Sequence, residues 1–305
     1  MAHLDATSGR SGRFGTTVPE PMAVIEVLKP ITWFPPMWAF ACGVVSSGVA
    51  LSDRWIFLVG GALLAGPLVC GASQAVNDWF DREVDAINEP QRVIPSGRLP
   101  GRWGLWIAIA ATLLSLVLSS FLGPWVMVAT IVGLALAWAY SAPPFRLKRD
   151  GWVGPLTCGF AYEALPWFTA AAVAVGTFPR TPVVAIAVLY GLGAFGIMVL
   201  NDFKSAKGDA IAGLRSLPVR YGTEGAVWIA CAAMVSAQIG VAILLASLGA
   251  TLYATVIGAL IALQLACMVR LRRDPERFAP WFNAVGTGLY VIGMMAAATA
   301  LRGVV

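Results

Sequence analysis

The sequence predicts an all-α, polytopic membrane protein with nine transmembrane helices. Of the 305 residues, 58% are hydrophobic and 12% are charged, whereas a typical soluble domain carries about 25% charged residues. The apolar residues form continuous runs, about as long as the roughly 20 residues that an α-helix needs to cross a bilayer. A transmembrane β-barrel would instead show ~10-residue segments of alternating polarity, so we expect helices throughout.

Nine apolar windows define the expected helices in chain order. They cover 31–51, 56–76, 104–122, 125–142, 153–175, 182–200, 226–246, 251–269 and 282–301. Residues 1–21 are rich in Gly, Ser, Thr and Pro and lack the apolar core of a signal peptide. We therefore expect a disordered cytoplasmic tail over 1–21, followed by a single membrane domain over 22–305.

The basic residues support this number of helices and predict their orientation. If the nine windows cross the bilayer, 18 of the 21 Lys and Arg residues lie on the side of the N-terminus, and only Arg54, Arg180 and Arg302 lie on the other. The positive-inside rule then predicts a cytoplasmic N-terminus and a C-terminus on the opposite side of the cell membrane. Because the positive charge is spread over loops, we expect the lipid bilayer as partner, and no nucleic acid.

Cysteine and histidine usage excludes several chemistries. The five cysteines are scattered through apolar windows without CxxC spacing, which indicates core residues and neither a disulfide framework nor a metal site. The single histidine, His3, lies in the predicted tail. Histidine is therefore excluded as a general base or metal ligand in the membrane domain.

An acidic motif occurs twice, at the predicted cytoplasmic ends of the second and sixth helices. Residues 77–87 read NDWFDREVDAI and residues 201–211 read NDFKSAKGDAI, so both fit Asn-Asp-x6-Asp-Ala-Ile. A lone Asp in such a loop is usually a solvated surface charge, but a repeat at matched spacing is not expected by chance. The two copies, at 77–85 and 201–209, indicate an internal duplication.

The acidic motifs predict a magnesium site that binds a diphosphate. If both helices continue past the bilayer, the acidic side chains of each copy share one helix face. Carboxylates this close repel one another unless a cation lies among them, and an all-oxygen set suits Mg²⁺ shared with a substrate phosphate. The expected metal ligands are Asn77, Asp78, Asp81, Asp85, Asp202 and Asp209. Neighbouring basic residues that can neutralise phosphate oxygens are Arg82, Arg92, Arg146, Lys148 and Lys204. No Walker loop is present, so we expect the diphosphate to be a leaving group.

With its two acidic motifs and nine predicted helices, the sequence resembles the UbiA superfamily of intramembrane prenyltransferases. The resemblance runs from about residue 20 to the C-terminus and is closest to the chlorophyll and bacteriochlorophyll synthases. The segments that carry it include Lys29–Trp38, Gly66–Gly71, Asp85–Pro90, Ile94–Gly97, Tyr140–Pro144, Arg146–Lys148, Leu165–Trp167, Asn201–Ser205 and Ser216–Pro218. The acidic motifs alone indicate the superfamily, and Asn-Asp-Phe-Lys at 201–204 with Ile-Pro-Ser-Gly at 94–97 narrows it to the pigment synthases.

This resemblance implies a reaction and its substrates. Geranylgeranyl or phytyl diphosphate, bound through Mg²⁺, would lose its diphosphate, and the propionate of a (bacterio)chlorophyllide would attack the allylic carbon. A carboxylate is already ionised at neutral pH, so no protein base is needed. The acidic side chains would bind Mg²⁺–diphosphate and the basic ones would stabilise the departing charge. No pigment-protein or reductase partner is indicated.

Aromatic side chains and one buried acid complete the expected site. Aromatic rings can shield an allylic cation, although each is equally well explained as an interfacial anchor. Glu163 is the one acid inside a predicted span, and such residues are usually paired or functional; we expect either a structural hydrogen bond or a place in the acceptor cavity. The expected prenyl and acceptor cavity comprises Trp33, Phe34, Trp38, Tyr140, Tyr162 and Glu163, with Trp79 and Phe80 as further aromatics.

The second motif departs from the family pattern. Family members usually carry Glu at the position of Lys207, Arg at that of Ala210 and Pro at that of Val93. Because Lys207 replaces an acid with a base, we expect it either to contact the diphosphate directly or to reduce turnover.

Two alternatives remain open. One is another prenyltransferase of the same superfamily, acting on an aromatic or quinone precursor. The other is a transporter in which the duplicated halves are repeats around a binding site, which would lie near the bilayer midplane rather than at the cytoplasmic helix ends.

Overall fold

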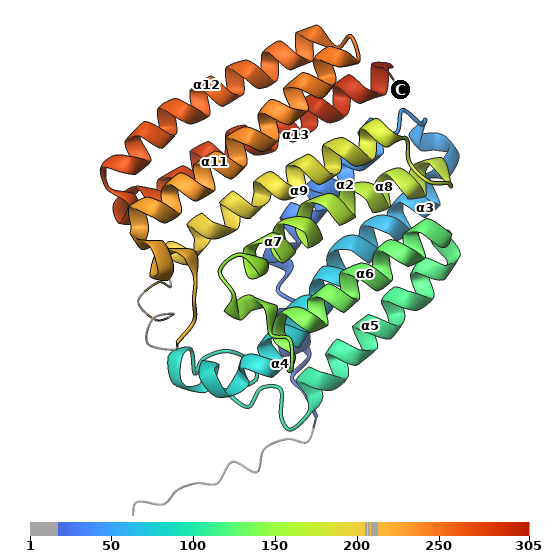
Figure 1. Cartoon of the computed structure of the whole chain (residues 1–305). Coiled ribbons are helices and arrows are strands. Elements are labelled where there is room, and N and C mark those ends of the chain that lie inside the picture. The colour runs from blue at the N-terminus through green and yellow to red at the C-terminus, as the bar shows by residue number, and fades with distance from the viewer. Residues whose placement is uncertain (1–17, 205, 207, 209–212, 305) are drawn as a thin grey trace, which may run out of the picture.

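The computed structural model describes residues 18–204, 206, 208 and 213–304. Long helices run side by side in one bundle, with the C-terminus at the end opposite to the N-terminal segment (Figure 1). The helices are α1 (Pro21–Val27), α2 (Phe34–Ser46), α3 (Leu51–Leu63), α4 (Gly71–Asn88), α5 (Trp103–Leu122), α6 (Pro124–Ser141), α7 (Val153–Gly159), α8 (Leu165–Val175), α9 (Thr181–Asn201), α11 (Leu217–Ser247), α12 (Thr251–Arg273) and α13 (Pro275–Val304). The predicted all-α fold is confirmed.

Every predicted window contains a helix, but the number of candidate spans differs by one. Within the described residues, eight helical segments are long and apolar enough to cross a membrane, so the protein is a multi-pass membrane protein. The window 31–51 corresponds to a 3₁₀ turn (Pro30–Trp33) and α2, which has 13 residues, about 20 Å at 1.5 Å per residue. The helix ends at Ser46, and two residues later Gly48 has a left-handed φ of 71°, which does not continue an α-helix.

Two helical rods contain a π-helical turn. Leu64–Cys70, which includes Pro67, joins α3 to α4, and Phe160–Ala164 joins α7 to α8. A π-turn shifts the faces that the flanking helices present, and such turns are frequent at functional sites. Both turns contribute residues to the cavity described below.

Small residues allow close packing of the central helices. A Cβ atom at Gly43 of α2 would collide with the carbonyl oxygen of Trp167 in α8, and one at Gly196 of α9 would collide with that of Ala230 in α11. Close backbone approach at Gly and Ala is typical of helix packing in membranes, where dispersion contacts replace the hydrophobic effect between helices.

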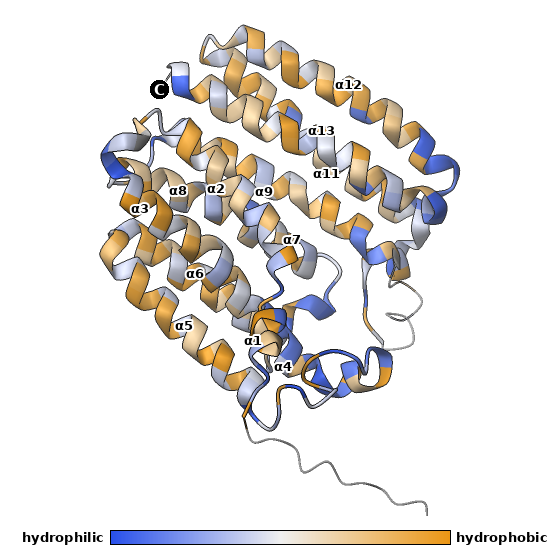
Figure 2. Ribbon diagram, turned by 180° about the vertical axis from the view of Figure 1, so that it is seen from behind, coloured by the Kyte–Doolittle hydropathy of each residue, from blue (hydrophilic) through white to orange (hydrophobic). Residues whose placement is uncertain are grey.

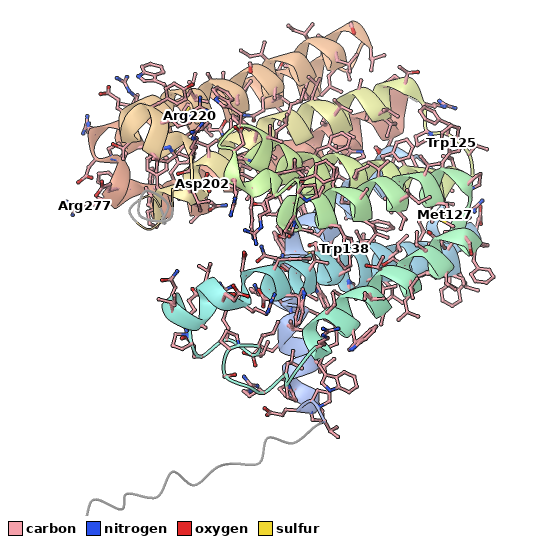
Figure 3. All side chains as sticks on the ribbon, turned by 60° about the horizontal axis from the view of Figure 1, so that its bottom comes forward. Trp125, Met127, Trp138, Asp202, Arg220 and Arg277 are labelled. Atoms are coloured by element: carbon pink, nitrogen blue, oxygen red, sulfur yellow. The ribbon has the colours of Figure 1, made fainter. Side chains whose placement is uncertain are left out.

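Charge is distributed unevenly between the two ends of the bundle. Apolar residues cover the helix bodies, and hydrophilic residues gather at the ends (Figure 2). Arg54 lies beside Gly176, and Gly48 beside the backbone of Arg302, so these two basic residues share one end. Asp202, Arg220 and Arg277 lie at the other end, away from Trp125 and Met127 (Figure 3). This is the arrangement that the charge pattern predicted, because the basic loops meet at one end of the bundle.

The predicted tail falls mostly outside the described residues. Of residues 1–21, the structure describes 18–21. Glu20 accepts a hydrogen bond from Arg98 Nε at 2.8 Å, and the short helix α1, which no apolar window predicted, packs Ala23 and Val27 against α4 and α5.

Candidate active site

A cavity of about 760 Å³ lies within the bundle. Its volume is within the range of roughly 300–1,000 Å³ that small-molecule sites occupy. It is lined by the 3₁₀ turn at Pro30–Trp33, both π-turns and the helices α2, α4, α6, α7, α8, α9 and α13. Of the residues predicted from the sequence, Phe34, Trp38, Asn77, Tyr140, Tyr162, Glu163 and Asp202 line this cavity.

The first acidic motif lies on a continuous helix. The apolar window ended at residue 76, but α4 continues to Asn88, so residues 77–85 are helical. The expectation that this helix runs past the apolar window is confirmed for this copy. The helix ends at Glu89, whose φ of −141° and ψ of 60° are not helical.

The acidic side chains of α4 divide between two adjoining faces. Asn77, Asp81 and Asp85 were expected on one face, yet the structure pairs Asp85 with Asp78 through a shared arginine. The reason is helical geometry: at 3.6 residues per turn, positions seven apart differ by about 20°, whereas positions eight apart differ by about 80°. Asn77 and Asp81 form one face, called here the cavity face, and Asp78 and Asp85 form the second, called the buttress face.

On the cavity face, a lysine holds the carboxylate of Asp81. Lys148 Nζ lies 2.5 Å from both carboxylate oxygens of Asp81. Asn77 Nδ2 donates to Asp81 Oδ2 at 3.1 Å and to Ser141 Oγ at 3.2 Å. Burial lowers the pKa of the Lys148 ammonium, although the neighbouring Asp81 favours the charged form. A cation and a carboxylate therefore face each other beside the cavity residue Asn77.

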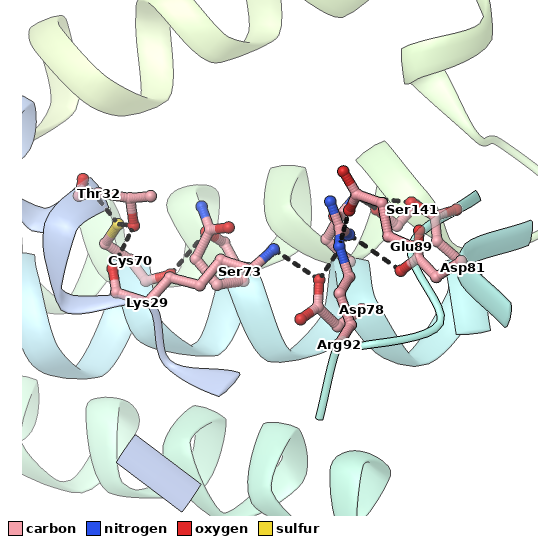
Figure 4. A network of polar contacts seen from close by, with 12 residues as sticks. Lys29, Thr32, Cys70, Ser73, Asp78, Asp81, Glu89, Arg92 and Ser141 are labelled. Atoms are coloured by element: carbon pink, nitrogen blue, oxygen red, sulfur yellow. Dashed lines mark hydrogen bonds and ion pairs between the residues drawn. The ribbon is translucent and has the colours of Figure 1, made fainter. Parts of the chain in front are cut away.

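On the buttress face, two cations hold two buried carboxylates. Lys29 Nζ donates to Asp78 Oδ1 at 2.6 Å. Arg92 Nη1 donates to Asp85 Oδ2 at 2.9 Å and to Asp78 Oδ1 at 3.4 Å, and its Nε also pairs with Glu89. Figure 4 shows Arg92 and Lys29 converging on Asp78. These ion pairs hold the segment before α2, through Lys29, and the segment after α4, through Arg92, against α4.

The other predicted cations differ in their placement. Arg82 Nη1 donates to the Trp79 carbonyl oxygen at 2.7 Å, its guanidinium stacks over the Trp79 ring, and it pairs with exposed Glu83. It thus contacts its own helix and does not line the cavity. Arg146 adopts a left-handed φ of 43°, and its buried Nε has no hydrogen-bond partner among the described residues.

The second acidic motif is only partly described. The helix α9 ends at Asn201, and Asp202–Lys204 form a 3₁₀ turn, so this copy does not continue as an α-helix from Asn201 as the first does. Asp202 lines the cavity, and Asn201 Oδ1 accepts a hydrogen bond from Asn283 Nδ2 at 2.9 Å. Lys204 is placed by its backbone alone, and the predictions for Lys207 and Asp209 lie outside the described residues.

Some of the predicted aromatic residues line the cavity and others do not. Tyr162 accepts a hydrogen bond from Gln74 Nε2 at 2.6 Å across the cavity wall, and Trp38 Nε1 donates to the Val291 carbonyl oxygen at 3.1 Å. Trp33 does not line the cavity, because its Nε1 is directed to the Leu28 carbonyl oxygen at 2.8 Å. Phe80 packs edge-on against Trp138, which places it outside the cavity lining.

Sequence reasoning missed three partners of the site: Lys29, Ser141 and Gln74. Lys29 and Ser141 both occur in segments that carry the family resemblance, so a search of those segments for residues able to pair with Asp would have found them. Gln74 precedes the motif by one helical turn, and its contact with Tyr162 needed the packing of α4 on the π-turn.

Among the residues that the structure describes, no three His, Cys, Asp or Glu side chains converge as a ready metal site. The carboxylates of α4 are held by ammonium and guanidinium groups instead. The donor atoms near the cavity face are nonetheless all oxygens, from Asn77, Asp81, Ser141 and Asp202, which is the donor chemistry that Mg²⁺ prefers. The residues therefore fit Mg²⁺ if Lys148 moves off Asp81.

Comparison with known proteins identifies the family. A model of the UbiA prenyltransferase family matches residues 32–301. The bacteriochlorophyll synthase 33 kDa chain of Cereibacter sphaeroides is 54% identical over 287 residues, covering 94% of this chain and 95% of the relative. The bacteriochlorophyll synthase 34 kDa chain of Chloroflexus aurantiacus is 45% identical, covering 91% and 89%. The chloroplastic chlorophyll synthase of Arabidopsis thaliana is 36% identical, covering 90% and 73%.

Solved structures share the fold at low sequence identity. A digeranylgeranylglyceryl phosphate synthase superposes with a TM-score of 0.73 at 19% identity, covering 91% of this chain and 98% of that one. A UbiA homolog from Archaeoglobus fulgidus bound to GPP and Mg²⁺ superposes with a TM-score of 0.70 at 19% identity, covering 90% and 99%.

Fold and cavity together define a multi-pass, α-helical membrane enzyme whose polar chemistry lies at one end of the bundle. The chain belongs to the UbiA prenyltransferase family.

Proposed function

We propose that this protein esterifies the propionate of a (bacterio)chlorophyllide with a geranylgeranyl or phytyl group from its diphosphate, releasing diphosphate. The single observation that carries the proposal is the 54% identity, over 94% of the chain, to a bacteriochlorophyll synthase chain. The cavity supports it, because a mostly apolar chamber adjoins, at Asn77, the ion pair of Asp81 with Lys148.

The charged groups of α4 and its neighbours fit the binding of a diphosphate with its cation. A bound Mg²⁺ would supply Lewis-acid neutralisation of the leaving diphosphate. Asn77, Asp81 and Asp202 offer oxygen ligands on the cavity side. Lys148 and Arg146 lie near them and provide donors for phosphate oxygens. From the second motif, Lys204 and Lys207 would add cations and Asp209 an oxygen ligand. Arg92, which holds Asp78 and Asp85, and Arg82, which contacts its own helix, do not belong to the proposed diphosphate site.

Binding requires an exchange of partners on the cavity face. The ammonium of Lys148 now neutralises Asp81 at 2.5 Å. If Asp81 instead binds the Mg²⁺ of a metal-bound diphosphate, the Lys148 ammonium is free to donate to a phosphate oxygen at the same place. The site would thus keep its charges neutralised both with and without substrate, which limits the cost of burying them.

No base is required of the protein. The acceptor carboxylate is ionised at neutral pH, so the protein needs only to hold its oxygen near the allylic carbon and exclude water. Tyr140, Tyr162 and Phe34 line the cavity and offer rings that can stabilise developing positive charge.

We also propose that the acidic end of the bundle faces the cytoplasm. The charged loops between the helices meet at this end, and the positive-inside rule places such loops in the cytoplasm. The N-terminal side then lies in the cytoplasm and the C-terminus on the opposite side of the cell membrane.

The test incubates the purified protein with geranylgeranyl diphosphate and bacteriochlorophyllide, with Mg²⁺ or with EDTA. We expect esterified pigment and an equal amount of diphosphate in the reaction with Mg²⁺, and neither product in the reaction with EDTA. A parallel reaction replaces the pigment with a hydroxybenzoate acceptor. Prenylation of the hydroxybenzoate without pigment ester would contradict the proposal and establish the aromatic alternative.

A further inference from the structure

The deep end of the cavity contains an acid that the proposed chemistry does not use. Glu163 lines the cavity and is 7% exposed. Its neighbour Ala164 packs against Gly191 of α9, which lies ten residues before Asn201, or about 15 Å along the helix at 1.5 Å per residue. Glu163 is therefore well removed from the acidic motif and cannot contact a diphosphate bound there.

One oxygen of the Glu163 carboxyl group has no hydrogen-bond partner in the described part of the protein. This atom, Oε2, is buried. The aspartates of α4 contrast with it, since each is held by Lys29, Arg92 or Lys148. An ionisable group unpaired within a membrane span is costly and is retained chiefly for function.

A second unpaired oxygen lines the same cavity. Thr287 on α13 has a buried Oγ1 without a hydrogen-bond partner among the described residues, and it is a lining residue. The hydroxyl of Thr130, also in the cavity lining, instead donates to the Val126 carbonyl oxygen at 2.8 Å. Two helices thus each bring an unsatisfied oxygen to one chamber.

The backbone presents Glu163 to the cavity through a π-turn. Phe160–Ala164 is π-helical, a distortion that is frequent at functional sites, and Ala161, Tyr162 and Glu163 of this turn line the cavity. Glu163 and Tyr162 therefore both belong to the cavity wall.

A prenyl chain offers nothing for these oxygens to bind, because it is a hydrocarbon. Ser73, Gln74 and Tyr162 add polar side chains to the lining of the same cavity. The molecule that reaches Glu163 along this lining must carry hydrogen-bonding groups far from its reacting carboxylate. Of the two substrates, only the tetrapyrrole acceptor does so.

We infer that Glu163 and Thr287 form a binding subsite for the carbonyl-bearing edge of the tetrapyrrole acceptor, joined to it by hydrogen bonds. The inference rests on the proposed function and assigns the deep chamber to the acceptor. Glu163 is a specificity-determining residue, and its carboxyl group takes no part in bond formation. A carboxylic acid or an amide at this position can donate to a carbonyl oxygen, whereas a hydrocarbon cannot.

The test compares Glu163→Leu and Glu163→Gln with the unmodified enzyme in detergent. Binding of bacteriochlorophyllide alone is followed by the change in its absorption spectrum, and the KM for each substrate is measured in the transfer reaction. We expect Glu163→Leu to raise the acceptor Kd and KM about tenfold, equivalent to one hydrogen bond, with the KM for geranylgeranyl diphosphate unchanged. Glu163→Gln should stay within about twofold of the unmodified enzyme.

A matched pair of threonine variants keeps the test decisive if Glu163→Leu fails to fold. Thr287→Val should weaken acceptor binding severalfold, whereas Thr130→Val, whose hydroxyl is already bonded within its helix, should not. Unchanged acceptor binding in both Glu163→Leu and Thr287→Val overturns the inference. So does an increase confined to the KM for the prenyl diphosphate, or a loss in Glu163→Gln as large as that in Glu163→Leu. Absence of pigment ester with the unmodified enzyme would instead overturn the proposed function.

Discussion

The two faces of α4 carry the same kind of side chain in different surroundings. On the cavity face, Asp81 keeps a quarter of its side chain exposed and is held by the single cation Lys148. On the buttress face, Asp78 is 4% exposed and is held by two cations, Lys29 and Arg92. A carboxylate that must accept a new ligand needs access and an exchangeable partner, and Asp81 has both. We infer that a carboxylate enclosed by two cations instead fixes chain segments, and that the motif combines a chemical face with a structural one.

The largest expected effect is on the cavity face. Asp81→Asn keeps the size and polarity of the side chain but removes the negative charge that binds the metal-bound diphosphate. We expect the rate of prenyl transfer to fall by about 100-fold or more, as for removal of one transition-state contact, while the melting temperature changes little. Initial rates of pigment esterification and a thermal unfolding curve measure the two quantities.

On the buttress face, the same substitution should act mainly on stability. Asp78→Asn leaves Lys29 and Arg92 with one charged partner fewer in a buried setting, which we expect to cost roughly 2–3 kcal/mol. The melting temperature should fall, and the enzyme that remains folded should retain a larger share of activity than Asp81→Asn. If Asp78→Asn were as inactive as Asp81→Asn with an unchanged melting temperature, the division into two faces would be wrong.

Lys148 is proposed to pair with Asp81 in the free enzyme and with a phosphate oxygen in the complex. Its loss of a proton should therefore make the KM for the prenyl diphosphate depend on pH. Because burial lowers the pKa of Lys148, its ammonium loses its proton at a lower pH than a free lysine would. The KM for the prenyl diphosphate should therefore rise as the pH increases toward that pKa. Lys148→Arg, whose guanidinium stays charged, should move this rise to higher pH, and Lys148→Met should raise the KM about tenfold at neutral pH. Arg149→Ala, at the neighbouring position, is the control and should leave the pH profile in place.

Arg82 should give the smallest effect. Its guanidinium contacts Trp79 and Glu83 on the surface of α4, and exposed pairs of this kind contribute at most about 1 kcal/mol. Arg82→Ala is expected to keep the transfer rate within about twofold. A loss comparable to that of Lys148→Met would place Arg82 at the diphosphate and return it to the set predicted from sequence.

Much of the fold was predictable, because continuous apolar runs and the positions of charges depend on local sequence. Each of the nine windows contains a helix, and the end of α5 at Leu122 matches the window that ends at residue 122. The division of basic residues between the two ends of the bundle was also predictable, because the number of helices alone assigns Arg54 and Arg302 to one end.

The missed features depend on three-dimensional packing. The continuation of the second helix past residue 76 was expected from the acidic motif, but the pairing of its charges by Lys29, Arg92 and Lys148 was not. Such pairing joins residues up to 67 positions apart and leaves no periodic signal. The π-turn at Phe160–Ala164 shifts the register of its helix, so the exposure of Glu163 to the cavity could not be derived from spacing alone.

The central claim is that the cavity face of α4 binds a prenyl diphosphate together with Mg²⁺. Calorimetric titration of geranylgeranyl diphosphate into the purified protein, in the absence of acceptor, tests it most directly. The account predicts saturable binding with Mg²⁺ that is lost with EDTA and in Asp81→Asn, and retained in folded Asp78→Asn. Equal affinity with and without Mg²⁺, or full affinity in Asp81→Asn, would contradict it.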